Sequence, residues 1–153
     1  MLHAAASVRE NAQAPYSHYW VGVAVLSNGR YYRGCNVERA SWTQTSHAEQ
    51  NAIDSMVAAL GPSKIEALSL VAAPENVKRI FPPVKTGIAR AIEEIPVPCG
   101  HCLQIIWENC FQDPDVRIYS LMSSGEIGVI TVGNAFPLRF GPEHLGVYYG
   151  SKK

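Results

Sequence analysis

The sequence predicts an α/β fold, a three-layer α-β-α sandwich built on a mixed sheet of about five strands. Short apolar stretches rich in β-branched residues alternate with segments of helical periodicity, in the order helix, two strands, helix, strand, helix, two strands. An Asn-Gly turn joins the first two strands, whereas helices separate several of the later ones. This combination indicates a mixed sheet with helices on both of its faces.

Local signals bound the expected elements. Ser27-Asn28-Gly29-Arg30 supplies the hairpin turn, and Ser46 with Glu49 fits a capping box at the start of a helix. Gly61-Pro62 ends that helix. The expected elements are a helix from Leu2 that ends before Pro15, strands at 19–26 and 31–36, a helix from about 46 to 60, a strand at 65–73, a helix from about 99 to 111, and strands at 116–121 and 127–132.

Length, charge and hydropathy exclude several classes of protein. The 153 residues fit one domain with its own core, so we expect a single domain over 1–153. Acidic and basic residues cancel, 13 against 13, so the chain has no bulk positive field for nucleic acid. No apolar run reaches transmembrane length, and the N-terminus lacks a signal-peptide pattern. We therefore expect a cytoplasmic protein without a membrane or nucleic-acid partner.

Two short motifs place candidate metal ligands at the starts of two expected helices. Cys99 and Cys102 lie in PCGHC, and His47 lies in TSHAEQNAI. Zinc takes nitrogen and sulfur ligands in tetrahedral sites, and a catalytic site keeps three protein ligands and one open position. The positive ends of the two helix dipoles would favour thiolates over thiols. We therefore expect His47, Cys99 and Cys102 to bind one Zn²⁺ per chain.

Each motif alone also has a simpler interpretation. His47 and Glu49 are typical of a solvated helix end, and a Cys-x-x-Cys pair also fits thiol redox chemistry. The redox interpretation leaves the His-x-Glu pair unexplained. A domain of this size needs no disulfides, so we expect Cys35 and Cys110 to be core thiols. His101 is a competing ligand, but it would point around its helix away from both thiolates.

Glu49 lies two positions from the expected ligand His47 and suits acid-base chemistry. Zinc lowers the pKa of a bound water to near neutrality, which makes the water a nucleophile. Attack on an amino-substituted ring carbon then needs a group that moves protons to the ring nitrogen and the leaving amine, as a carboxylate does. The two motifs together resemble the signature of zinc-dependent nucleobase deaminases. We expect Glu49 to be the catalytic residue and not a ligand.

Five segments, in order, resemble the signatures of the cytidine deaminase family. They are APYSHYWVGVAVL (14–26), GCNVERASW (34–42), HAEQNAI (47–53), PCGHCLQ (98–104) and FPLRFGPEHL (136–145). The resemblance implies the cytidine deaminase fold over a single catalytic domain. It also implies zinc-dependent hydrolytic deamination of cytidine and deoxycytidine to the uridines and ammonia, a reaction of pyrimidine salvage.

The same resemblance implies a substrate site. Asn36 and Glu38 would bind the ribose hydroxyls, which suit an amide and a carboxylate. Tyr19 would line the nucleoside pocket, and the backbone amide of Ala48 would bind the base. Phe140 would stack on the base from a neighbouring subunit, so we expect a homo-oligomer.

Some positions depart from the family pattern. His47 with the neutral Gln50 resembles the larger dimeric members, whereas the chain length resembles the tetrameric ones, and we favour a tetramer over a dimer. Leu103 and Arg139 stand where an arginine and a small residue are common. The connection at about 74–97 is about twice the usual length, and such connections are usually functional or disordered. We expect it to be a surface elaboration or subunit contact with a short helix at 86–94, the alternative being a lid that changes the substrate.

Three further functions compete with cytidine deamination. One is deamination of a modified or analogous aminopyrimidine nucleoside. A non-catalytic zinc domain that binds nucleosides or a partner is another, but it has no use for Glu49. A tRNA or polynucleotide deaminase fits less well, because the net charge is zero and Asn36 and Glu38 suit a free nucleoside.

Overall fold

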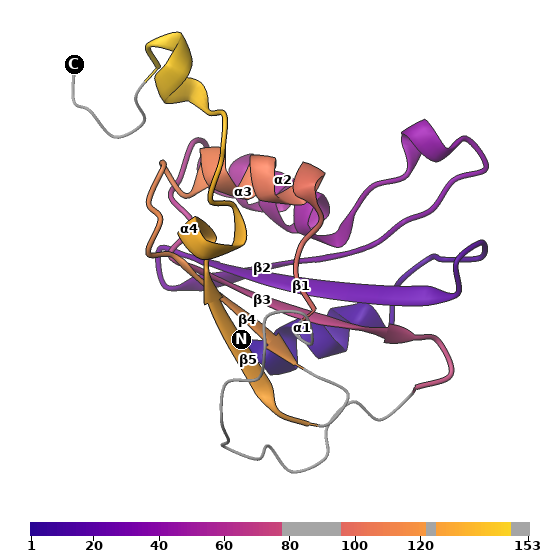
Figure 1. Ribbon diagram of the computed structural model, residues 1–153. Coiled ribbons are helices and arrows are strands. Elements are labelled where there is room, and N and C mark those ends of the chain that lie inside the picture. Colours follow the sequence, from indigo (N-terminus) through magenta and orange to yellow (C-terminus); the bar gives the residue numbers. More distant parts are fainter. Residues whose placement is uncertain (78–95, 122–124, 148–153) are drawn as a thin grey trace.

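The computed structural model describes residues 1–77, 96–121 and 125–147. Its five strands form one sheet in the order β2-β1-β3-β4-β5 (Figure 1). The strands are β1 (Tyr19–Ser27), β2 (Arg30–Cys35), β3 (Ala67–Pro74), β4 (Arg117–Leu121) and β5 (Ile127–Thr131). The helices are α1 (Leu2–Arg9), α2 (Ala48–Leu60), α3 (Gly100–Asn109) and the short α4 (Val132–Ala135), and 3₁₀ turns lie at Trp42–Gln44 and Pro142–Leu145.

The sheet is mixed, as the sequence predicts. β3 and β4 run parallel, whereas β1 with β2, β1 with β3, and β4 with β5 are antiparallel. Asn28 and Gly29 both have positive φ, 50° and 69°, which gives the β1–β2 hairpin the twist that antiparallel strands favour. The parallel β3–β4 pair requires a long crossover, and α3 lies within it.

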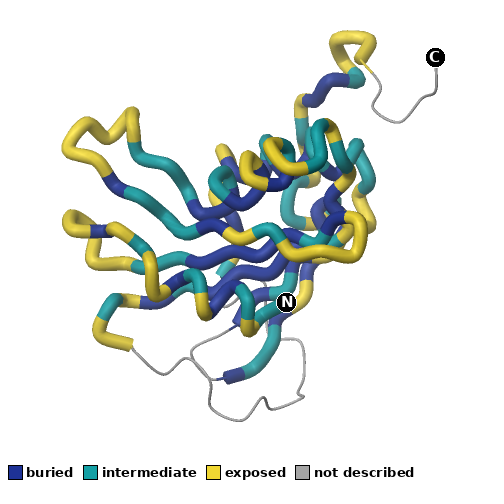
Figure 2. The backbone as a smooth tube through the Cα atoms, turned by 180° about the vertical axis from the view of Figure 1, so that it is seen from behind, coloured by how far each residue is buried: buried dark blue, intermediate teal, exposed yellow. Residues whose placement is uncertain are grey.

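The sheet has helices on both faces. Helix α1 packs on one face, and α2 and α3 pack on the other (Figure 1). The larger core lies between the sheet and α2 and α3, and a smaller one lies under α1. Figure 2 shows the buried backbone concentrated in the central strands and the helix faces that meet them. The predicted three-layer α-β-α sandwich is confirmed.

Two glycines allow the helices to approach the sheet closely. A Cβ on Gly22 in β1 would lie 2.1 Å from the Ala5 carbonyl oxygen in α1. A Cβ on Gly34 in β2 would lie 2.3 Å from the Ala48 carbonyl oxygen, at the first residue of α2. Both contacts are with backbone atoms, so each helix can occupy its place only because the strand residue lacks a side chain.

The structure corrects one local prediction, the start of the second helix. Helix α2 begins at Ala48, and its N-cap is His47, so the expected Ser46–Glu49 capping box does not form. Ser46 instead pairs with Val37 in an antiparallel bridge. Helix α1 starts at Leu2 and ends at Arg9, before Pro15 as predicted. The short helix expected at 86–94 lies outside the described residues.

None of the helices in the described part of the chain is long and apolar enough to cross a membrane.

Candidate active site

The three predicted metal ligands meet between two helix starts. His47 is the N-cap of α2, Cys99 is the N-cap of α3, and Cys102 lies in the first turn of α3. Neither N-cap side chain makes a capping hydrogen bond, so both remain available as ligands. The N-termini of both helices also place partial positive charge beside the thiols, which favours their ionised form.

The geometry of this cluster fits zinc. His47 Nδ1 lies 3.5 Å from Cys99 Sγ and 3.3 Å from Cys102 Sγ. The three ligand atoms lie within 4.8 Å of one another. Two ligands at ordinary Zn–N and Zn–S bond lengths and a tetrahedral angle stand about 3.5 Å apart. His101 is exposed, its ring centre is 5.6 Å from that of His47, and it lies outside the cluster.

The chemistry of the donors also calls for a cation. Burial raises the pKa of the Cys102 thiol far above its ordinary value, and the nearby charges of Glu49 and Cys99 raise it further. A buried thiol beside a carboxylate has no reason to ionise unless a positive charge lies next to it. A metal ion supplies that charge, so these residues form a coherent cation site.

Glu49 lies beside the cluster and is not one of its ligands. It occupies the first turn of α2 and is only 5 % exposed. It lines a cavity of about 500 Å³ together with His47, Ala48 and Cys99. A carboxylate in this place can exchange protons with a molecule held in the cavity next to the cluster.

The cavity also contains four of the five predicted nucleoside-binding residues. Its wall includes Tyr19, Asn36, Glu38 and Ala48. They come from β1, from the segment directly after β2 and from the start of α2, and the fold brings them to one side of the metal cluster. A cavity of this size, with apolar walls and a few converging polar groups, is typical of a small-molecule site.

Asn36 and Glu38 are held by backbone hydrogen bonds. Asn36 Oδ1 accepts from the Val21 amide at 2.9 Å, and Asn36 Nδ2 donates to the Tyr19 carbonyl at 2.9 Å. Glu38 Oε2 accepts from the amides of Tyr16 and Ser17 at 2.9 and 3.1 Å. Burial raises the pKa of the Glu38 carboxyl, but hydrogen bonds from Ser17 and from these amides lower it by more. Glu38 is therefore an ionised acceptor in a fixed position.

Phe140 does not reach the cavity within its own chain. Of the described residues that line the cavity, none comes from the segment after α4. Phe140 is 57 % exposed on that segment, which projects from the body of the molecule (Figure 1). Arg139 stacks on Trp107, 4.0 Å from its ring centre, and Trp107 Nε1 donates to Glu143 at 3.1 Å. These contacts attach the base of the segment to α3.

The structure also shows where Leu103 and the remaining cysteines lie. Leu103 belongs to the main core, which accounts for an apolar residue there. All four cysteines are free, Cys110 is fully buried, and burial raises its pKa to about 11. Cys35 is half-buried, so it is only partly the core thiol that we expected.

Several cavity residues were not predicted as site residues, although three of them, Ser17, Val21 and Trp42, lie inside the segments that resemble the family signatures. Val21 follows Tyr19 at the two-residue spacing of one strand face, and Leu70 and Ala72 share a face of β3, so strand alternation was an available signal. The remaining residues of the wall lie in loops or, for Trp42, in a short 3₁₀ turn, where the sequence offers no periodicity. They are Ser17, Trp42, Thr45, Pro96 and Val97.

Comparison with known proteins identifies the family of this chain. Residues 1–116 match the family model described as the cytidine and deoxycytidylate deaminase zinc-binding region. The chain belongs to the cytidine and deoxycytidylate deaminase family. This family membership confirms the resemblance inferred from the five sequence segments.

Individual relatives are consistent with this family. A cytidine deaminase of Sporosarcina psychrophila is 33% identical over 138 residues, which is 90% of this chain and 86% of that protein. A cytidine deaminase of Halalkalibacterium halodurans is 32% identical over 146 residues, 95% of each chain. The crystal structure of cytidine deaminase from Burkholderia pseudomallei superposes with a TM-score of 0.67 at 29% identity, covering 91% of this chain and 95% of the other. The fold is therefore shared along nearly the whole length of the Burkholderia pseudomallei enzyme.

Proposed function

We propose that this deaminase hydrolyses the exocyclic amino group of cytidine and deoxycytidine, which yields the uridines and ammonia for pyrimidine salvage. The observation that carries the proposal is Glu49, a buried carboxylate beside a cluster of three zinc-type ligands and inside a nucleoside-sized cavity. A structural metal site has no need of such a carboxylate. The names of the related proteins support the same substrate class.

His47, Cys99 and Cys102 would hold Zn²⁺, which supplies a Lewis acid that activates water when bound. Glu49 then serves as the proton carrier. Its carboxylate would take one proton from the attacking water and deliver it to the ring nitrogen of the base. It would then take the second proton from the hydroxyl now on the ring carbon and pass it to the amine, which leaves as ammonia as the C–N bond breaks and the carbonyl forms. Because Glu49 is buried and shielded from solvent, it exchanges protons with the substrate rather than with bulk water.

The cavity residues would orient the nucleoside. Glu38 accepts hydrogen bonds from ribose hydroxyls, Asn36 offers an amide to the same sugar, and the Ala48 amide meets the base. Tyr19 provides an apolar wall. Phe140, exposed on a projecting segment, is suited to stack on a base held by a second copy of the chain, so we propose a homo-oligomer, a tetramer in preference to a dimer.

A second enzymatic candidate is a modified or analogous aminopyrimidine nucleoside as the substrate. It is favoured by Pro96 and Val97, which line the cavity and belong to the connection at about 74–97 that departs from the family pattern. A free nucleoside fits the neutral chain better than a nucleic acid does, and a cytoplasmic location agrees with such a substrate.

Loss of cytidine ultraviolet absorbance upon addition of protein tests the proposal. We expect turnover by the wild type, and we expect Glu49→Ala to lower kcat by at least about 10² while keeping one zinc per chain, because the general acid-base group alone is removed. Glu49→Gln is the matched variant, because it keeps the size of the side chain and removes only the carboxylate. A wild type that holds zinc but is inert toward a panel of aminopyrimidine nucleosides would leave a non-catalytic binding domain as the function.

A further inference from the structure

We propose that Arg9 is a positioning residue, which fixes the side-chain amide of Asn36 for ribose binding through the peptide between Trp20 and Val21. The inference rests on the proposed function only in that Asn36 is taken to contact the nucleoside sugar. Arg9 itself lies on the opposite side of strand β1 from the cavity, at the end of helix α1.

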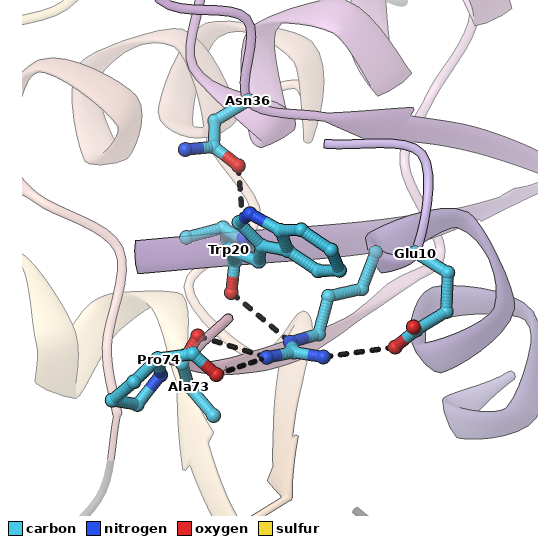
Figure 3. A network of polar contacts seen from close by, with 7 residues as sticks. Glu10, Trp20, Asn36, Ala73 and Pro74 are labelled. Carbon is cyan, nitrogen blue, oxygen red and sulfur yellow. Dashed lines mark hydrogen bonds and ion pairs between the residues drawn. The ribbon is translucent and has the colours of Figure 1, made fainter. Parts of the chain in front are cut away.

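Arg9 is a fully buried cation with an unusual set of partners. Its side chain is 0% exposed. Nε donates to the Trp20 carbonyl at 3.2 Å, and Nη2 donates to the carbonyls of Ala73 and Pro74 at 2.9 and 2.7 Å (Figure 3). Nη1 pairs with Glu10 at 2.9 Å. The guanidinium therefore binds the ends of two adjacent strands, because Trp20 in β1 is the register partner of Ala73 in β3.

One peptide unit connects Arg9 with Asn36. The Trp20 carbonyl accepts from Arg9, and the N–H of the same peptide, that of Val21, donates to Asn36 Oδ1 at 2.9 Å (Figure 3). A cation on the carbonyl side polarises a peptide, so its N–H becomes a stronger donor. The hydrogen bond that holds Asn36 is thus strengthened from the far side of the strand.

The contacts also fix the orientation of the Asn36 side-chain amide, that is, the positions of its oxygen and its nitrogen. Nδ2 donates to the Tyr19 carbonyl at 2.9 Å while Oδ1 accepts from Val21. A flipped amide would set oxygen against the Tyr19 carbonyl and nitrogen against the Val21 N–H. One N–H of Nδ2 and one lone pair of Oδ1 remain for a ligand. Asn36 lines the cavity, so these free positions are the ones a sugar hydroxyl would meet.

The planar shape of the guanidinium is essential to this arrangement. Arginine presents several N–H groups in a rigid fork, and here they meet three carbonyls and one carboxylate. Lysine keeps the charge but places it at a single point, so it cannot serve Trp20 and the end of β3 together. Arg9→Lys therefore separates the positioning role from the presence of a cation.

Two substrates report on the sugar contact. Cytidine has both ribose hydroxyls, whereas 2′,3′-dideoxycytidine has neither. We expect Arg9→Lys to lower kcat/KM for cytidine by about tenfold, mainly through KM, because a charge-assisted hydrogen-bond chain is weakened. For the dideoxynucleoside the loss should stay within about twofold, since no hydroxyl meets Asn36. In the Asn36→Ala background, Arg9→Lys should have little further effect on cytidine.

A second variant covers the case that Arg9→Lys does not fold. Glu10 is exposed, so Glu10→Lys is tolerated by the core and sets a second cation beside the guanidinium, which repels it from its place. We expect Glu10→Lys also to lower kcat/KM more for cytidine than for 2′,3′-dideoxycytidine, and to lower it by less than Arg9→Lys does. Lys64→Gln is the matched control, because Lys64 pairs with Asp113 at 2.7 Å outside the cavity, and both substrates should react as in the wild type.

The outcomes separate this inference from the proposed function. Equal losses for both nucleosides in an active enzyme, or additive effects of Arg9→Lys and Asn36→Ala, would overturn the positioning role alone. A wild type that is inert toward both nucleosides would overturn the proposed function, and the assigned role of Arg9 with it.

Discussion

Glu38 is a buried carboxylate whose ionised form is stabilised by the fold. Its Oε2 accepts hydrogen bonds from two backbone amides, and the residue is 5% exposed. The pKa of this carboxyl is lowered in the folded protein, even though burial opposes the shift. A carboxyl with a lowered folded pKa stabilises the protein above the pKa of the unfolded chain, about 4.3, and loses that contribution as pH falls through the folded value.

Replacement of Glu38 by Gln should therefore have a pH-dependent effect on stability. Glutamine can accept the same amides but carries no charge, so its hydrogen bonds are weaker. We expect the Tm difference between wild type and Glu38→Gln to be largest near neutral pH and to shrink as pH falls below about 4. Thermal unfolding followed by circular dichroism across this range provides the measurement. A difference that is independent of pH would contradict the assignment.

Single residues differ in how well sequence alone predicts them. His47, Cys99 and Cys102 were predicted as one cluster because the His-x-Glu and Pro-Cys-x-x-Cys motifs together resemble a known zinc signature, although neither motif suffices alone. Arg9 was not predicted, because an arginine in the last turn of a short helix ordinarily remains in solvent. Its burial depends on where β1 and β3 end, and that is a non-local property.

At the scale of elements, the two sheet glycines that lie against helices, Gly22 and Gly34, provide a matched pair. Gly34 faces the start of α2, which carries His47 and Glu49, whereas Gly22 faces α1 on the opposite side. An added methyl group at either position overpacks the helix-sheet contact, which typically costs about 1–3 kcal/mol.

We expect Gly34→Ala and Gly22→Ala to lower the free energy of unfolding by similar amounts, measured by urea denaturation. Only Gly34→Ala should weaken zinc binding, because it pushes the first turn of α2 away from the α3 ligands. Competition with a chromogenic chelator measures the zinc affinity. Equal zinc affinity in the two variants would contradict this expectation, because it would mean that α2 accommodates the methyl group without moving His47.

Elements were predicted well where periodicity is strong and less well at their ends. The strands and the α2 and α3 helices follow their apolar patterns. The capping box failed because Ser46 is engaged with Val37, a partner outside the local window that defines the motif. The pairing of Ser46 with Val37, a residue outside the capping motif, thus decided where α2 begins. The residues of the motif are nevertheless present in the sequence.

For the whole molecule, a bound metal would connect the two helices that cover one face of the sheet. Metal bound only by the folded state adds stability by mass action, about 2.7 kcal/mol at a free concentration of 100 times Kd. Because the pKa of the Cys102 thiol is raised in the metal-free protein, metal binding at neutral pH releases a proton from it, and affinity falls as pH is lowered.

Removal of zinc by a chelator should lower Tm by several degrees, as about 2–4 °C per kcal/mol is usual for a domain of about this size. Calorimetric scans with and without chelator measure the shift. Cys102→Ala is the control, because it lacks one ligand and should respond far less. A chelator effect of equal size in both proteins would mean that the stabilising metal binds elsewhere.

The chain distance between the ligands has a consequence for the order of folding. His47 and Cys99 stand 52 positions apart, with β3 between them. Both helices must be docked on the sheet before these side chains meet, and long-range contacts of this kind form slowly. Zinc is therefore expected to leave the folding rate almost unchanged and to slow unfolding, so that the metal protects the finished molecule instead of guiding its assembly.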